Sequence, residues 1–236
     1  MATYVMTDIH GEYDKFMLML EQIQFTEADK LILLGDNVDR GPKNMAVLEF
    51  IYDNPNVESL IGNHELMMLA SLLPSGYKSR EVGNWFRNGG TATLADIKAY
   101  AKQHGEDKAS AIIASCMDWK FYQFLEVNGR KFLCIHAGYW MASPERYQTV
   151  YDGDPETMLK DTPDIEKVWL RKDFYYRAGI PGYITLFGHT PTPQLHNSSK
   201  IWHDLQYKDK IGLDCGAAYN GLLACLRLDD MAEFYV

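Results

Sequence analysis

The segment LILLGDNVDRG, at residues 31–41, decides the fold. Its four consecutive apolar residues are typical of a strand that is buried on both faces. This strand runs directly into a glycine and then into the polar residues Asp36, Asp39 and Arg40. Chance would fix five residue types within seven positions about once in ten thousand chains of this length. The segment therefore indicates a buried strand that ends in a functional loop.

Four further apolar runs end in the same way, in polar residues that can bind a metal ion. The polar residues that follow these runs are Asp8 with His10, Asn63 with His64, His136, and His189. In open α/β sheets, ligands bind beyond the carboxyl ends of the strands. We therefore expect the five strand ends to bring these side chains to one place.

The spacing of apolar residues between the runs predicts how the first part of the chain folds. Helix-length segments join the runs at 4–6, 31–34 and 57–61, which predicts a βαβαβ unit with a mainly parallel, buried sheet. Glycines break short amphipathic stretches from 75 to 123, and we expect a helical insertion there over one end of the sheet. The chain has no linker or fixed-period repeat, so we expect a single domain over residues 1–236.

The second half of the chain returns to strands. Two apolar runs flank the pair Asn128-Gly129, which predicts a β-hairpin. Residues 144–182 contain four of the nine prolines and are predicted to be rich in loops. The strand-like runs of the tail are predicted to be antiparallel, and they lie at 183–187, 211–213, 222–228 and 231–235.

Composition excludes several classes of protein. The chain has 236 residues, of which 47% are hydrophobic and 23% charged, as in a globular protein rather than a disordered or fibrous one. Its net charge of -9 gives no general attraction to nucleic acid or to an anionic membrane. No apolar run is long enough to span a bilayer, and the first residues do not resemble a signal peptide. The four scattered cysteines are expected to be reduced and buried, as in a cytoplasmic protein.

The residue types at the strand ends constrain the metal. Carboxylates, imidazoles and an amide oxygen without a thiolate suit Mn, Fe or Zn, whereas Ca would take oxygen ligands alone. Six candidates exceed what one tetrahedral ion needs, and a carboxylate can bridge two ions. We therefore expect two divalent metal ions per chain, manganese in the first place and iron or zinc as alternatives. The candidate ligands are Asp8, His10, Asp36, Asn63, His136 and His189.

The order of the motifs resembles a known family. Asp-x-His-Gly, Gly-Asp-x-x-Asp-Arg-Gly, Gly-Asn-His-Glu, His-Ala-Gly and Gly-His-Thr follow one another as in the PPP-type metallophosphatases of the calcineurin-like metallophosphoesterase superfamily. The chain is most similar to their short bacterial and phage members, such as the bacteriophage lambda serine/threonine phosphatase, from Tyr4 to about Ala218. The resemblance implies an α/β fold, the four-layer metallophosphatase sandwich of two mixed β-sheets flanked by helices, with a helical insertion.

The resemblance also implies how the metal ions are held. One ion is assigned to Asp8, His10 and Asp36, and Asp36 bridges to a second ion that is assigned to Asn63, His136 and His189. A hydroxide held between the two ions is the implied nucleophile, and it attacks phosphorus directly. No covalent phosphoenzyme is required.

The remaining site residues act on the substrate in this comparison. Arg40 and Arg171 grip the phosphate, for which a planar guanidinium is suited, and Asn63 is also assigned to the substrate. His64 protonates the leaving oxygen, and Asp39 holds the His64 imidazole in its charged form.

Three functions follow from these residues. The leading expectation is a binuclear-metal phosphomonoesterase, a serine/threonine protein phosphatase that acts on phosphoserine or phosphothreonine, with phosphotyrosine as a further option. The alternative is a symmetrical dinucleoside tetraphosphate hydrolase of the diadenosine tetraphosphate type, which the motif Arg40-Gly41-Pro42 also resembles. The third is an inactive phosphate-binding scaffold, which is disfavoured because every expected site position carries workable chemistry. The expected partner is a phosphoprotein or a small phosphorylated substrate.

Overall fold

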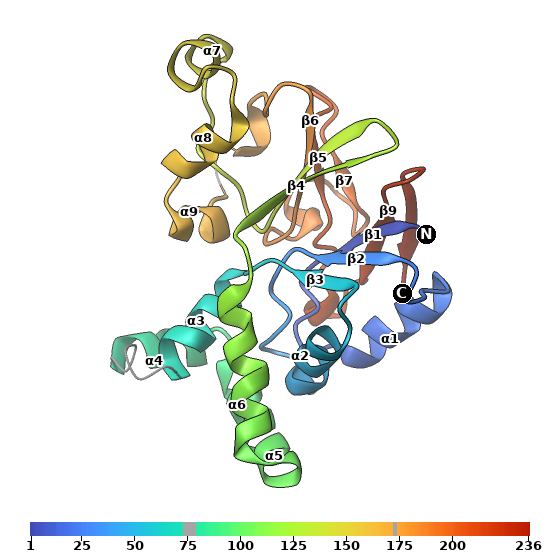
Figure 1. Ribbon diagram of the computed structural model, residues 1–236, viewed down its shortest axis with the longest axis vertical. Helices are drawn as coiled ribbons and strands as arrows, with labels where there is room; N and C mark the ends of the chain where they lie inside the picture. Colours follow the sequence, from blue (N-terminus) through green and yellow to red (C-terminus); the bar gives the residue numbers. More distant parts are fainter. Residues whose placement is uncertain (73–78, 172–173) are drawn as a thin grey trace.

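The computed structural model describes residues 1–72, 79–171 and 174–236. Its strands form two five-stranded mixed sheets that lie near the middle of the molecule, with helices outside them (Figure 1). The α/β sandwich of two mixed sheets flanked by helices that the sequence predicts is therefore confirmed.

The first sheet has the strand order β10-β9-β1-β2-β3. Its strands are β1 (Thr3–Met6), β2 (Lys30–Leu33), β3 (Val57–Ser59), β9 (Ala224–Arg227) and β10 (Ala232–Tyr235). β1, β2 and β3 are parallel, and the helices α1 (Tyr13–Gln22) and α2 (Asn44–Asp53) connect them. The predicted βαβαβ unit is thus confirmed, while β9 and β10 complete the sheet in the antiparallel direction.

The second sheet has the order β4-β5-β6-β8-β7. Its strands are β4 (Tyr122–Val127), β5 (Arg130–Ile135), β6 (Tyr183–Phe187), β7 (Trp202–His203) and β8 (Lys210–Gly212). β4 and β5 form the predicted hairpin about Asn128-Gly129, but β5, β6 and β8 are parallel. The prediction that the whole tail is antiparallel is therefore wrong for β6 and β8, because residues 188–209 form a crossover long enough to reverse the chain direction.

Both faces of the central strands are buried, which explains their continuous apolar runs. Tyr4 and Met6 of β1 pack in one cluster with Phe16 of α1. Val5, between them, points to the other face and packs with Phe132 of the second sheet. Successive side chains of a strand point to opposite faces. Both sets of side chains are therefore buried in a strand that lies between two apolar layers, and both must be apolar.

Three short helices follow the hairpin of the second sheet: α7 (Pro144–Tyr151) and α8 (Pro155–Asp161), which pack in one cluster with β5, and α9 (Asp164–Trp169), which contacts α3. The prediction that residues 144–182 are rich in loops is wrong for this part. Pro155 stands in the first turn of α8, where a missing N–H costs nothing. The Asp154 carboxylate accepts hydrogen bonds from the N–H groups of Glu156 and Thr157 at 3.2 and 3.1 Å. Proline here begins a helix instead of breaking one.

The predicted insertion is helical where the structure describes it. It contains α4 (Ser79–Arg87), α5 (Gly90–His104) and α6 (Glu106–Ser115), and it follows α3 (Asn63–Leu72). These helices extend away from one end of the first sheet (Figure 1). Residues 75–78, where the insertion is predicted to begin, lie outside the described residues.

Two expectations from composition can be compared with the structure. All four cysteines are buried and unpaired, as expected. Within the described ranges, no helix combines the length and the apolar character needed to cross a bilayer.

A buried lysine ties the second sheet to the loops beside it. Lys210 of β8 is 1% exposed, and its Nζ lies 2.6 Å from the carbonyl oxygen of Arg177 and 3.2 Å from Oδ2 of Asp204. Lys210 Nζ also donates to the carboxylate of Asp209. This ammonium group therefore compensates two carboxylates next to the crossover.

We expect Lys210→Met to lower the free energy of unfolding by about 3–5 kcal/mol, because it leaves buried carboxylate charge without a partner. Chemical denaturation measures the change. Lys160→Met, at a lysine whose side chain is 69% exposed, is the matched control and should change stability little. A loss at Lys210 no larger than at Lys160 would contradict this role.

Candidate active site

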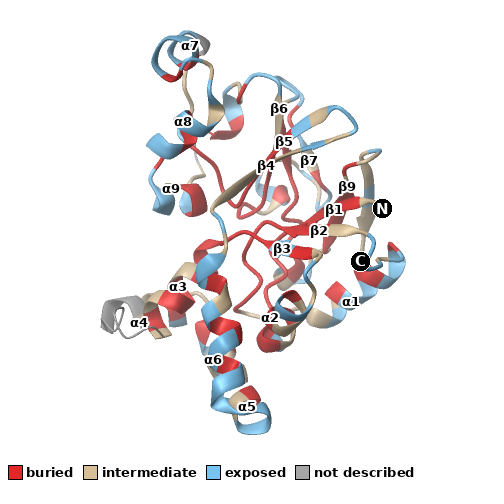
Figure 2. Ribbon diagram, viewed as in Figure 1, coloured by how far each residue is buried: buried red, intermediate tan, exposed pale blue. Residues whose placement is uncertain are grey.

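The strand ends of both sheets meet in the centre of the molecule. Asp8 follows β1, Asp36 follows β2 and Asn63 follows β3, whereas His136 and His189 follow β5 and β6 of the second sheet. All five residues are buried, and Figure 2 shows buried chain running through the centre where the strands end. The structure therefore brings the side chains at the five strand ends together, as the sequence predicts.

Asp36 occupies the middle of the site. Its Oδ2 lies 3.4 Å from Nε2 of His136, 3.8 Å from Nε2 of His10 and 3.9 Å from Nε2 of His64. Its Oδ1 accepts a hydrogen bond from the backbone N–H of His64 at 3.0 Å. One carboxylate is therefore within reach of imidazoles from both sheets, which is the position that a bridging ligand needs.

Two groups of potential ligand atoms share Asp36. His10, Asp36 and His64 form one group, and Asp36, His136 and His189 form the other; in each group the atoms lie within 4.8 Å of one another. The predicted ligand Asp8 joins the first side, with Oδ1 3.8 Å from Nε2 of His10. The predicted Asn63 joins the second side, where its Oδ1 lies 3.1 Å from Nε2 of His136. All six predicted ligands are thus brought together.

The imidazole rings are oriented as metal ligands require. Nδ1 of His10 lies 2.7 Å from the carbonyl oxygen of Val38, and Nδ1 of His136 lies 2.9 Å from that of Leu34. A carbonyl only accepts, so Nδ1 of each ring carries a proton, and Nε2 faces the six predicted ligands, which are called the cluster below. Among the described residues, the buried Nε2 of His189 has no hydrogen-bond partner. These nitrogen and carboxylate donors fit a divalent cation of the Mn, Fe or Zn kind.

Buried negative charge dominates the electrostatics. Burial and the neighbouring Asp36 carboxylate raise the pKa of Asp8. Burial alone would lower the pKa of His136, but the carboxylates of Asp36 and Asp8 outweigh it and raise the pKa to about 9. A divalent cation between these groups would relieve the repulsion and displace the proton from His136.

Backbone strain is concentrated at the same residues. In the described part of the chain, twelve non-glycine residues have a positive φ, and half of them are predicted site residues: Asp8, His10, Asp36, Asp39, Arg40 and His189. A left-handed conformation is unfavourable for such residues and tends to persist at functional sites. Two glycines make room for the turns, because a Cβ at Gly62 would lie 2.2 Å from Oδ1 of Asp36 and one at Gly188 2.2 Å from Oδ2 of Asp8.

Glu65 fixes the loop that carries Asp36. Its carboxylate accepts hydrogen bonds from the N–H groups of Asp36 at 2.9 Å, Asn37 at 2.7 Å and Gly62 at 2.9 Å. Burial and the adjacent Asp36 raise the pKa of Glu65 to about 7. The predicted site omits Glu65, although its position two residues after Asn63 was a usable signal.

The predicted pair of His64 and Asp39 is in contact. Nδ1 of His64 lies 2.6 Å from Oδ2 of Asp39. Trp85 donates from Nε1 to both Asp39 oxygens, at 2.9 and 3.0 Å, and the Thr93 hydroxyl donates to Oδ1. Burial alone would lower the pKa of His64, but the carboxylates of Asp36 and Asp39 outweigh it and raise the pKa. The helical insertion thus orients the pair, which its local sequence does not reveal.

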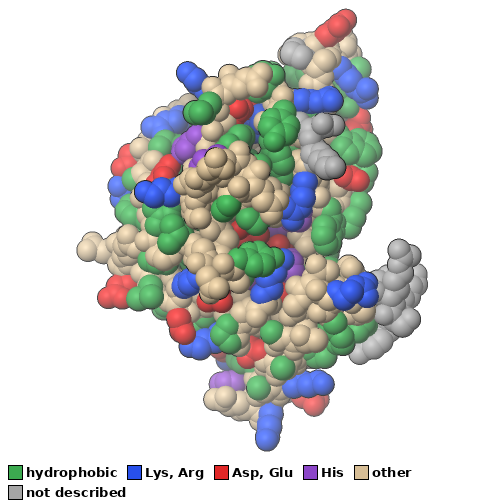
Figure 3. Space-filling view, turned by 180° about the vertical axis from the view of Figure 1, so that it is seen from behind, with side chains coloured by type: hydrophobic (Ala, Val, Ile, Leu, Met, Phe, Trp, Pro, Cys, Tyr) green, Lys and Arg blue, Asp and Glu red, His purple; other side chains and the backbone are tan. Residues whose placement is uncertain are grey.

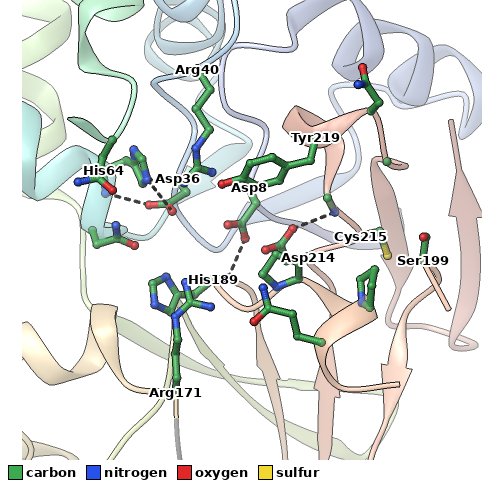
Figure 4. Close-up of a pocket in the computed structure, with 18 of the residues that line it drawn as sticks. Asp8, Asp36, Arg40, His64, Arg171, His189, Ser199, Asp214, Cys215 and Tyr219 are labelled. Atoms are coloured by element: carbon green, nitrogen blue, oxygen red, sulfur yellow. Dashed lines mark hydrogen bonds and ion pairs between the residues drawn. The ribbon is translucent and has the colours of Figure 1, made fainter. Parts of the chain in front are cut away.

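The two predicted phosphate-binding arginines reach the site from opposite sides (Figure 4). Nη2 of Arg40 lies 2.9 Å from Nε2 of His64, and Nη1 lies against Nε2 of His10. Arg171 donates from Nη1 to Oγ1 of Thr190 at 3.2 Å. Both guanidinium groups therefore lie where an anion at the cluster would meet them.

Asp214 is a sixth residue at a strand end, and the predicted site omits it. It follows β8 and lines the same cavity, and its Oδ1 accepts a hydrogen bond from the N–H of Gly216 at 3.0 Å. Burial and the nearby Asp8 raise the pKa of Asp214 well above its ordinary value. The sequence contains a signal for Asp214 as a site residue, because the run at 211–213 precedes it as similar apolar runs precede the other predicted site residues.

The cluster opens into a cavity of about 470 Å³. In the view of Figure 3, acidic and histidine side chains lie at the bottom of a hollow near the middle of the face, with basic and hydrophobic side chains at its rim. Besides cluster residues, the cavity is lined by Asn88, Trp169, Pro191, Pro193, Gln194, Ser199, Cys215, Tyr219 and Asn220. The cavity therefore has room for groups beyond a single phosphate.

Residues 1–213 match the model of the calcineurin-like phosphoesterase family. The chain belongs to this family, which the site geometry and the two-sheet fold also fit. Members of the metallophosphoesterase class bind divalent metal ions, in agreement with the buried His and Asp groups described above.

Curated relatives extend the comparison over nearly the whole chain. The chain is 25% identical over 279 residues to the symmetrical bis(5'-nucleosyl)-tetraphosphatase of Buchnera aphidicola, which covers 99% of this chain and 97% of the relative. The protein of the same name from Erwinia tasmaniensis is 28% identical over 282 residues, covering 99% and 96%. That of Haemophilus influenzae is 31% identical over 185 residues, which span 75% of this chain and 54% of the relative.

Solved structures support the fold alone. A protein assigned as a diadenosine tetraphosphatase has a TM-score of 0.65 and 17% identity, over 99% of this chain and 92% of that chain. A protein serine/threonine phosphatase from Saccharomyces cerevisiae has a TM-score of 0.59 and 13% identity, over 100% and 79%.

These relatives correct the leading expectation. The assignment as a serine/threonine protein phosphatase is wrong, because relatives that align over almost their full length are named symmetrical tetraphosphatases. The motifs that carry the resemblance to PPP-type phosphatases lie in the part of the chain that matches the calcineurin-like phosphoesterase family as a whole. These motifs therefore indicate the type of reaction, whereas the choice of substrate depends on the residues at the rim of the cavity.

We expect Asp36→Asn to lower the content of bound divalent metal severely, because a neutral amide replaces the carboxylate shared by the two groups of potential ligands. Elemental analysis of the purified variant measures the metal content. Asp14→Asn, at a carboxylate whose side chain is 74% exposed, is the control and should keep the wild-type content. Full occupancy in the Asp36 variant would contradict the bridging position.

Proposed function

We propose that the protein is a metal-dependent hydrolase that splits dinucleoside tetraphosphates symmetrically. The observation that carries the proposal is the alignment with symmetrical bis(5'-nucleosyl)-tetraphosphatases over up to 97% of their length. The cavity supports it, since 470 Å³ beside the cluster exceeds the need of one phosphate. Water adds across the central P–O–P bond, which breaks, and each half leaves as a nucleoside diphosphate.

The arginines hold the polyphosphate in place. Arg40 and Arg171 approach the cluster from opposite sides, so a chain of phosphates that passes over Asp36 would meet a guanidinium at each end (Figure 4). A planar guanidinium binds phosphate oxygens in a bidentate manner and keeps its charge at any working pH. This arrangement centres the middle of the substrate on the cluster.

Two divalent ions, manganese with iron or zinc as alternatives, complete the proposed site. Asp8, His10 and Asp36 would hold one ion, and Asp36 together with Asn63, His136 and His189 would hold the other. When bound, such ions lower the pKa of a coordinated water and neutralise charge on the phosphoryl oxygens. The backbone N–H groups bound by Glu65 keep the shared carboxylate in position.

His64 is the proposed proton donor to the leaving oxygen. Asp39 fixes its Nδ1, so that Nε2 faces the cavity beside Arg40. Asp39 itself is held by Trp85 and Thr93, so the imidazole has little freedom to rotate. A proton donor at this place shortens the lifetime of charge on the departing group.

The location proposed for this activity is the cytoplasm. Its support is the state of the four cysteines, which are buried and unpaired, as is usual for proteins of a reducing compartment.

The substrate assignment is tested by comparing two substrates on the manganese-loaded protein. Diadenosine tetraphosphate should be converted to ADP alone, with a higher kcat/KM than a phosphoserine peptide, because the cavity and both arginines are used only by the longer anion. Chromatography of the nucleotides and a phosphate-release assay measure the two reactions. Turnover of the peptide without cleavage of the dinucleotide would overturn the proposal.

We expect His64→Ala to keep the metal ions and to lower turnover about 10²–10⁴-fold for a phosphate ester with a poor leaving group. The effect should be smaller for an ester with a good leaving group, since that group departs without a proton. Steady-state kinetics with the two esters measure both values. The control is His104→Ala, at an exposed residue that ends α5. If the His64 variant and the wild type hydrolyse the ester with the poor leaving group at equal rates, His64 has no part in the mechanism.

A further inference from the structure

We infer that the two nucleosides of the symmetrical substrate stack on two exposed aromatic side chains of the cavity, Tyr219 beside Arg40 and Trp169 on the side of Arg171. The inference rests on the proposed function and names the parts of the site that recognise the ends of the substrate. Tyr219 and Trp169 are called the aromatic pair below. Neither residue belongs to the metal ligands or to the groups assigned to proton transfer.

Tyr219 is placed to receive a base next to a bound phosphate. The guanidinium carbon of Arg40 lies over its ring, 4.9 Å from the ring centre. Tyr219 is nevertheless 61% exposed, so most of its surface is not used for packing. The ring therefore lines the cavity with a free aromatic surface directly beside a phosphate-binding group (Figure 4).

The turn that carries Tyr219 is fixed from several sides. Its N–H donates to the carbonyl of Gly216 at 2.8 Å, and Nζ of Lys15 on α1 donates to the carbonyls of Ala217 and Gly221 at 2.8 and 3.1 Å. A Cβ at Gly221 would lie 2.4 Å from the carbonyl oxygen of Cys215, so the turn is also tightly packed. A ring presented on a preorganised turn costs little conformational entropy when a ligand binds.

Trp169 occupies the corresponding place in the other half of the site. It ends α9, lines the cavity and is 36% exposed. Its ring meets that of His189 edge to face, with 5.8 Å between the ring centres. Arg171, two residues further along the chain, lies next to His189 (Figure 4). An aromatic residue thus accompanies each arginine, one from either half of the cluster.

This arrangement matches the symmetry of the substrate. A dinucleoside tetraphosphate carries its charge in the middle and a nucleoside at each end. The cavity has the proposed metal ligands in the middle, an arginine on either side and an aromatic residue with each arginine. Stacking on an aromatic side chain is favourable for every base, since each base has a π face. We therefore expect the aromatic pair to recognise nucleosides without choosing strongly among the bases.

The test separates nucleoside binding from phosphate binding. Isothermal titration of the manganese-loaded protein with ADP and with inorganic pyrophosphate is carried out for the wild type, Tyr219→Leu and Trp169→Leu. Each variant should weaken one of the two ADP-binding events about 5- to 150-fold, the range that corresponds to loss of one stacked base, and pyrophosphate binding much less. The KM for diadenosine tetraphosphate should rise in parallel, and Tyr219→Phe should restore ADP binding because the ring is retained.

Matched controls are available on the surface. Tyr52→Leu and Trp140→Leu remove aromatic residues that are 50% and 51% exposed and that do not line the cavity, and they should leave ADP binding unchanged. The metal content of each variant is measured in parallel, because Trp169 contacts His189. Equal losses for ADP and pyrophosphate in a variant of normal metal content would overturn the inference, whereas failure of the wild type to cleave diadenosine tetraphosphate would overturn the proposed function instead.

Discussion

The structure depends on keeping the ionised carboxylate of Asp36 buried between two sheets. Asp36 is 2% exposed, and its stability there comes from a backbone N–H and from imidazoles of both sheets. Burial alone would raise the pKa of Asp36, but the imidazoles of His136 and His64 outweigh burial and hold its pKa well below the ordinary value. Buried charge of this kind is tolerated only where partners are fixed around it, so the surrounding turns have little freedom to vary.

The fold supplies that fixed surrounding. Because both faces of the central strands are covered, the strands cannot shift in register without exposing one apolar set, and their carboxyl ends remain at one edge. The turns beyond these ends adopt left-handed backbone conformations at six of the predicted site residues, and glycines such as Gly62 and Gly188 allow them to approach. Strain in the turns is thus balanced by apolar packing in the sheets.

Prediction from sequence succeeded where local pattern and burial agree. The parallel unit of the first sheet, the hairpin and the convergence of the six candidate ligands follow from apolar runs that end in polar residues. Prediction failed where the outcome depended on distant partners. Pro144 and Pro155 begin helices because the first turn of a helix needs no N–H group from them, and β6 and β8 became parallel because of their crossover. The protein phosphatase assignment failed because the motifs encode metal chemistry shared by enzymes with different substrates.

The sequence by itself determined the elements of the first sheet, the family and the kinds of side chain in the site, since each depends on residues close together along the chain. Only the tertiary structure decided that Trp85 and Thr93 of the insertion orient Asp39, that Asp214 joins the other strand ends, and that Tyr219 lies under Arg40. These contacts join residues that are remote in sequence and carry no periodic signal. They form only when the sheets stack and bring the loops of both halves to a common edge.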